Sequence, residues 1–314
     1  MKNLKYEKRL AGSLLLILML VEISVVFWLQ SKKLLEDVPY IIDCLLGELI
    51  LVMPSIIIMG IWYFIHIWKV STGKESEEIS ISDRLMYKGA RPTTLMVVIP
   101  YTMLVMPMMT FFNIVSMSFT ENVVLEDAKA IASMPIYLSL FLIAVVPAFC
   151  EEFVFRGVIY GGFRRCCRPV PAIVMSAFLF GLMHLNFNQF LYAFPMGIMA
   201  ALLVEASGTI WSSVLFHCLV NTPSVISLSF SDELDLALEG QLILPISVYA
   251  FYFVTAVITI FLACLLLKWI AKRETRENPL LLIKNSRYYK GISIWSVALV
   301  LSIVISVWMM VRML

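Results

Sequence analysis

Two adjacent glutamates and an arginine stand inside a long apolar stretch. Glu151 and Glu152 follow an uncharged run from Ala130 to Cys150, and Arg156 comes four residues after Glu152. On a helix, residues four apart share a face, whereas neighbours differ by about 100°. Arg156 is therefore predicted to pair with Glu152 and to leave Glu151 free. A free carboxylate in a cleft of low dielectric can act as a general base. The plainer alternative is a structural ion pair at the membrane boundary.

The three histidines of the chain all fall within apolar stretches. His184 follows Phe180 by four residues, and His217 precedes Asn221 by four. A histidine and an asparagine on one helical face can donate hydrogen bonds to a developing oxyanion. Taken alone, each histidine is as well explained by a hydrogen bond between helices. His66 lies near the end of its stretch beside aromatic residues and is interpreted as interfacial.

These three motifs, taken in order, resemble a known family. The pattern EExxxR, FxxxH and HxxxN is that of the CAAX protease and bacteriocin-processing family (CPBP, also called Abi). The Ras-converting CAAX prenyl endopeptidase belongs to this family. The motifs lie at residues 151–156, 180–184 and 217–221, and the resemblance covers about residues 130–230. It implies an intramembrane endopeptidase, and the flanking stretches are not diagnostic.

The resemblance also implies a role for each motif residue. Glu151 would act as the base on a water molecule, with His184 assisting. His217 and Asn221 would form the oxyanion hole. The predicted ion pair beside Glu151 would hold the geometry of the site.

Whether a metal takes part is left open by the sequence. Glu151, His184 and His217 would make a plausible zinc set, and members of the family are called metalloproteases. The zinc motif HExxH is absent, because Leu185 follows His184 and Cys218 follows His217. No carboxylate is evidently placed to orient the histidines, as metal-binding histidines usually require. We therefore favour a metal-independent glutamate mechanism, with zinc as the alternative.

Other functions were weighed against the same residues. A serine-type intramembrane protease would need a GxSx motif, which Ser207-Gly208 does not supply, and an aspartyl type would need a GxGD motif, which is absent. A non-catalytic immunity or partner-binding membrane protein could keep the motifs for structure. A proton-coupled transporter could use Glu and His as a relay, but the paired repeats common in transporters are not seen. The intact set of motifs favours catalysis.

The composition places these motifs in a lipid environment. Hydrophobic residues make up 61% of the 314 residues and charged residues 15%, with a mean hydropathy of +0.91. Soluble domains carry about 25% charged residues. The net charge of +2 gives no reason to expect a nucleic-acid partner. The chain is predicted to be an integral membrane protein that acts on a peptide or membrane-protein substrate, with or without a lipid modification.

A bilayer core of about 30 Å needs about 20 apolar residues in a helix. The sequence predicts an all-α transmembrane bundle of eight or nine helices, because the fifth and sixth segments are short and could be partly re-entrant. The segments are Leu10–Leu29, Ile41–Trp68, Thr93–Ser116, Pro135–Phe155, Val170–Leu185, Phe190–Glu205, Ile210–Ser227, Leu242–Leu267 and Ile292–Val311.

The distribution of positive charge predicts the orientation. With the N-terminus in the cytoplasm, the cytoplasmic pieces contain 20 of the 24 Lys and Arg residues, in agreement with the positive-inside rule. The end of the fourth segment, and with it the cleaved bond, would then lie near the cytoplasmic membrane face. The compact loops are typical of a bacterial cell-membrane protein. We expect N-terminal helices in residues 1–129, a catalytic helical core in residues 130–230, and C-terminal helices in residues 231–314.

Overall fold

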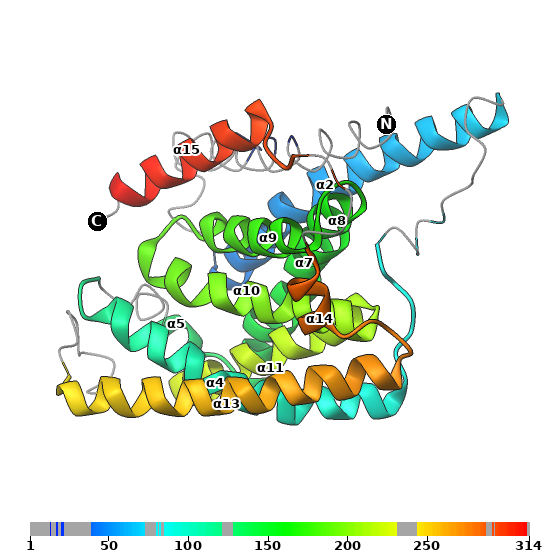
Figure 1. Cartoon of the computed structure of the whole chain (residues 1–314). Helices are drawn as coiled ribbons and strands as arrows, with labels where there is room; N and C mark the ends of the chain where they lie inside the picture. The colour runs from blue at the N-terminus through cyan, green and yellow to red at the C-terminus, as the bar shows by residue number, and fades with distance from the viewer. Residues whose placement is uncertain are drawn as a thin grey trace.

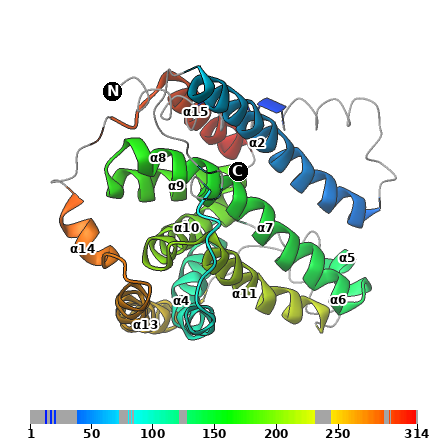
Figure 2. The same cartoon turned by 90° about the vertical axis from the view of Figure 1, so that its right-hand side faces the viewer.

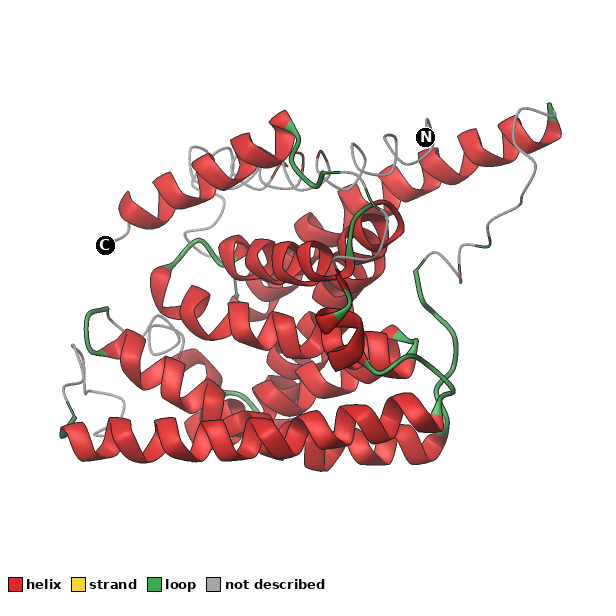
Figure 3. Cartoon of the chain, viewed as in Figure 1, coloured by secondary structure: helices red, strands yellow, loops and turns green. Residues whose placement is uncertain are grey.

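The computed structural model describes residues 39–72, 85–120, 128–230, 244–286 and 293–312, together with positions 13, 17, 20, 21, 80, 82 and 291. These residues form helices and connecting turns, and no strand occurs among them (Figures 1 and 3). The predicted all-α class is confirmed. The first expected segment, Leu10–Leu29, and the acidic segment 231–243 lie outside the continuously described residues.

The remaining eight expected segments each correspond to helical structure. The long helices are α2 (Tyr40–Ser71), α4 (Pro92–Met117), α9 (Pro169–Met183), α10 (Phe187–Ser207), α11 (Ile210–Ser229), α13 (Ile246–Arg273) and α15 (Val297–Arg312). The fourth segment is a succession of α6 (Ile136–Ser139), η2 (Leu140–Val145), α7 (Val146–Glu152), η3 (Phe153–Tyr160) and α8 (Gly161–Cys166). Two short helices were not expected, α5 (Ala128–Ser133) and α14 (Pro279–Lys284).

Five helices among the described residues are long and apolar enough to cross a membrane. They are Tyr40–Ser71, Pro92–Met117, Ile136–Cys166, Phe187–Ser207 and Ile246–Arg273. Helices α9 and α15 are apolar but shorter. The chain is therefore a multi-pass membrane protein.

Helix α10 lies at the centre of the bundle (Figures 1 and 2). In its most apolar window 67% of the residues are buried inside the protein, against 11% for α2. Close packing requires small residues on α10, because a Cβ atom at Gly197 would come within 2.9 Å of the Ala177 backbone on α9. The Tyr101 hydroxyl of α4 donates a hydrogen bond to the Met199 carbonyl of α10, 2.9 Å away.

The structure corrects the expected end of the fourth segment. The charges at residues 151–156 suggested a boundary at Phe155, but the helix continues without a break to Cys166. Glu151 lies fifteen residues from either end of this span, Ile136 and Cys166. At about 1.5 Å per residue this is roughly 20 Å from each end. Glu151, Glu152 and Arg156 therefore lie near the middle of this helix, and their place near the cytoplasmic membrane face stays a prediction.

Several connections meet at one end of the bundle, on the right of Figure 1. The Ile210 amide donates to the Met86 carbonyl over 3.0 Å, which joins the segment before α4 to the start of α11. The Arg276 side chain donates to the Glu205 carbonyl over 2.8 Å, which joins the segment after α13 to the end of α10. The alternating topology requires these connections on one side of the membrane. That this side is the cytoplasm stays a prediction.

Candidate active site

The two glutamates end a short α-helical section between two π-helical ones. Helix α7 (Val146–Glu152) is preceded by η2 and followed by η3. A π-helical turn takes in an extra residue and changes the direction in which the following side chains point, and such turns are frequent at functional sites. Pro147 in α7 contributes to the irregularity, because it has no N–H for the helix ladder.

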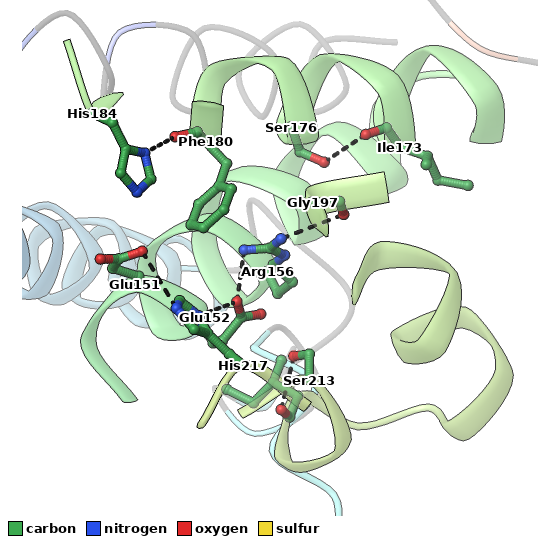
Figure 4. A network of polar contacts seen from close by, with 11 residues as sticks. Glu151, Glu152, Arg156, Ile173, Ser176, Phe180, His184, Gly197, Ser213 and His217 are labelled. Atoms are coloured by element: carbon green, nitrogen blue, oxygen red, sulfur yellow. Dashed lines mark hydrogen bonds and ion pairs between the residues drawn. The ribbon is translucent and has the colours of Figure 1, made fainter. Parts of the chain in front are cut away.

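Glu152 is fully buried and held by two partners (Figure 4). Its Oε1 atom accepts a hydrogen bond from Arg156 Nη1 at 2.7 Å and another from His217 Nδ1 at 3.0 Å. Arg156 is itself buried, and its Nη2 donates to the Gly197 carbonyl of α10 at 3.4 Å. The pairing predicted from the four-residue spacing is present. It lies near the middle of the helix Ile136–Cys166 and is buried inside the protein.

Glu151 has a different environment from its neighbour. Its side chain is 18% exposed, and its Oε2 atom lies 4.0 Å from His217 Nε2. That oxygen is buried and has no hydrogen-bond partner among the described residues. His217 thus bridges the two carboxylates, with one ring nitrogen toward each. Since a carboxylate oxygen accepts and does not donate, His217 Nδ1 must carry a hydrogen.

His184 follows the last residue of α9, and its ring is oriented by its own helix. Its Nδ1 lies 3.0 Å from the Phe180 carbonyl oxygen, which can act only as an acceptor. In the neutral ring the hydrogen is therefore on Nδ1, and Nε2 has a free lone pair. Figure 4 shows the His184 ring and Glu151 on the same side of Phe180.

The Phe180 ring is a support that the sequence analysis did not assign. Its centroid is 5.2 Å from that of His184 and 5.9 Å from that of His217, both edge-on. The Arg156 guanidinium lies over the same ring at 4.4 Å, in a cation–π contact. The spacing from His184 marked this residue in the sequence, but a contact with three site residues on different helices cannot be derived from spacing.

Asn221 lies one turn after His217 on α11, and its amide is used by the backbone. Its Nδ2 donates to the Ile143 carbonyl of η2 at 3.1 Å. In an α-helix this carbonyl would accept from residue 147, which is a proline without an N–H. Asn221 therefore supplies a donor to a carbonyl whose α-helical donor is missing at Pro147. Its expected part in an oxyanion hole stays a prediction. The second N–H of the Asn221 amide remains for that role.

Helix α2 brings a third carboxylate to this region. Glu48 accepts a hydrogen bond from the Cys150 thiol and is close enough to Glu151 for their charges to interact. Its Oε2 atom is buried without a hydrogen-bond partner in the described part of the chain. Its place beside the motif residues was not foreseen.

The geometry of the site tests whether these residues could hold a metal ion. The argument that no carboxylate orients the histidines is wrong for His217, because Glu152 accepts from its Nδ1. Zinc bonds of about 2.1 Å in a tetrahedron place two ligands about 3.4 Å apart. Glu151 Oε2 and His217 Nε2 are 4.0 Å apart. Across the described ranges no group of three or more His, Cys, Asp or Glu residues is arranged to hold a metal ion. As placed, Glu151, His184 and His217 do not form a zinc site.

Comparison with known proteins gives one match. Residues 133–223 match the family model described as Type II CAAX prenyl endopeptidase Rce1-like. Neither the curated proteins nor the solved structures contain a match. The matched segment contains all seven residues of the three motifs and falls within the expected core of residues 130–230. Residues 133–223 therefore form a domain of the CAAX protease family of membrane peptidases.

Proposed function

We propose that the chain is an intramembrane endopeptidase in which Glu151 activates the attacking water. The observation that carries this proposal is the unequal environment of two adjacent glutamates. Glu152 has a guanidinium at 2.7 Å and an imidazole at 3.0 Å on one oxygen. Each glutamate has a buried Oε2 atom without a hydrogen-bond partner among the described residues, but only Glu152 has donors on its other oxygen. A carboxylate that has no guanidinium partner and accepts no hydrogen bond is the better proton acceptor of the two.

The proposed reaction follows from this difference. Glu151 takes a proton as the water oxygen attacks the carbonyl carbon of the peptide bond. The lone pair of His184 Nε2 helps to orient the same water. Negative charge develops on the carbonyl oxygen and is stabilised by N–H donors, for which the free N–H of Asn221 and the protonated form of His217 are the candidates. When the C–N bond breaks, the proton on Glu151 passes to the leaving amine.

The substrate is a peptide that reaches the interior of the span. Because Glu151 lies fifteen residues from each end of Ile136–Cys166, the cleaved bond must reach the middle of this helix. This supports a membrane-associated peptide, and a lipid modification on the substrate would assist its entry by adding apolar area. A non-catalytic binding protein would have no need for a buried carboxylate without a partner, which is costly within a bilayer.

The experiment is cleavage by the purified protein in lipid nanodiscs. A library of peptides, each prepared with and without a C-terminal isoprenoid, is incubated with the protein, and products are mapped by mass spectrometry. We expect one preferred bond to be cut by the wild type and not by Glu151→Gln. Absence of cleavage across both arms, with a folded protein, would contradict the proposal and favour a non-catalytic role. Equal cleavage of the peptides with and without the isoprenoid would show that the lipid is not recognised.

A further inference from the structure

The turn after His184 has an unusual backbone. Helix α9 ends at Met183, and the chain reverses through His184, Leu185 and Asn186 into α10. Leu185 has a φ of 54°, in the left-handed region that residues with a side chain rarely adopt. Such a conformation persists only where the surroundings hold it, and it is common at functional sites. Contacts around Leu185 must therefore hold this backbone conformation.

Asn186 uses both ends of its side-chain amide at this turn. The Oδ1 atom accepts from the Gln189 backbone N–H at 2.8 Å, which caps the N-terminus of α10. The Nδ2 atom donates to the His184 carbonyl at 2.8 Å and to the Gln189 side chain. The cap belongs to α10, whereas the bond to His184 closes the turn that carries the histidine.

The start of α10 is fixed firmly enough to serve as a reference for this turn. Asn188 is buried, and its Nδ2 donates to the Ser116 hydroxyl of α4 at 2.7 Å. The Phe187 ring packs against Phe119 with centroids 5.8 Å apart. Through Asn186, the His184 backbone is therefore tied to a helix that is itself anchored to α4.

We propose that Asn186 is a positioning residue for His184, which it holds by its carbonyl while Phe180 holds its ring. The ring is fixed at Nδ1 by the Phe180 carbonyl, 3.0 Å away. The backbone is fixed by Asn186 Nδ2. Together the two contacts determine the direction of His184 Nε2. The catalytic consequence rests on the function proposed above, in which His184 assists the water.

Two variants separate the two roles of the Asn186 side chain, which caps α10 through Oδ1 and donates to the His184 carbonyl through Nδ2. Asn186→Asp keeps an oxygen for the Gln189 N–H and caps a helix as well as asparagine does, but it removes both N–H donors. Asn186→Ser also keeps a cap and adds no charge beside His184. Gln189→Ala serves as the control, because it removes a side-chain partner of Asn186 and leaves the bond to the His184 carbonyl.

The test combines kinetics with a direct view of the ring. Losing a contact that orients a functional histidine typically lowers activity by about 10–100-fold. We expect that fall in kcat for both Asn186 variants, with KM and the melting temperature close to wild type and Gln189→Ala near wild-type rate. Losses of activity that merely follow losses of melting temperature would overturn the proposal.

The same variants are examined by ¹⁵N NMR of histidine-labelled protein, where His184→Gln assigns the signal among three histidines. The wild type should show one His184 state with the hydrogen on Nδ1, and the Asn186 variants should show additional or broadened states. An unchanged His184 spectrum would overturn the proposal whether or not a substrate is known. A wild type that cleaves no peptide, with the expected NMR changes, would count against the proposed function alone.

Discussion

The bond between Asn221 and Ile143 predicts an energetic coupling to Pro147. Asn221 donates to a carbonyl whose α-helical partner is lost because residue 147 is a proline. Asn221→Ala should leave that carbonyl without its side-chain donor. In a Pro147→Ala background the backbone N–H returns, and the same Asn221→Ala change should strand nothing.

The magnitude follows from the cost of an unpaired polar group. Leaving one buried acceptor without a donor costs about 1–3 kcal/mol. Asn221→Ala should therefore destabilise the wild type by about that amount and the Pro147→Ala protein by much less. The difference is a coupling free energy of about 1–2 kcal/mol, within the range found for residues in contact. Pro147→Ala alone should be neutral or stabilising, because proline in a helix interior is unfavourable.

The assay is thermal unfolding of the four proteins in one detergent, with turnover measured on the same samples. An equal loss of stability from Asn221→Ala in both backgrounds would refute the reasoning. Turnover gives a separate answer. If Asn221 also stabilises the oxyanion, its removal should cost about 10²–10³ in rate in both backgrounds. A rate that recovers fully in the double variant would show that Asn221 acts through the helix alone.

Three further predictions concern the ion pair, the metal and the topology. Glu152→Gln and Arg156→Ala should each lower the melting temperature and the yield of folded protein, because breaking a buried pair by removing one partner costs about 3–5 kcal/mol; near-normal melting of either variant would contradict this. Stoichiometric zinc should not copurify, because three donors are not assembled; about one metal per chain by elemental analysis, lost in His184→Ala, would overturn that. Reporter fusions in residues 69–92 and 231–243 should report the cytoplasm and the outside respectively, and two reporters on one side would disprove the segment map.

Much of the fold could be predicted because membrane helices follow simple rules. Apolar length identified every described helix that crosses the bundle, since the backbone must satisfy its own hydrogen bonds in lipid. The Glu152–Arg156 bond followed from the four-residue spacing in the same way. These features are local in the sequence, and local geometry is sufficient to derive them.

The errors came from contacts between distant residues. Charges at residues 151–156 suggested the end of a helix, because the sequence does not show that His217 and the Gly197 carbonyl complete a buried network around them. The partner of Asn221 depends on a backbone irregularity at Pro147. Glu48 meets Cys150 only through the packing of α2 against α7. None of these pairings has a sequence period that would reveal it.

The central claim is that Glu151, and not Glu152, takes the proton from water. The most direct measurement is the cleavage rate of Glu151→Gln on the preferred peptide, with thermal melting in the same nanodiscs. Removing a general base while keeping size should lower kcat by about 10²–10⁴ with the melting temperature retained. Full activity in Glu151→Gln would contradict the account. Loss of fold in Glu151→Gln, with normal folding and no activity in Glu152→Gln, would show that the two glutamates have exchanged roles.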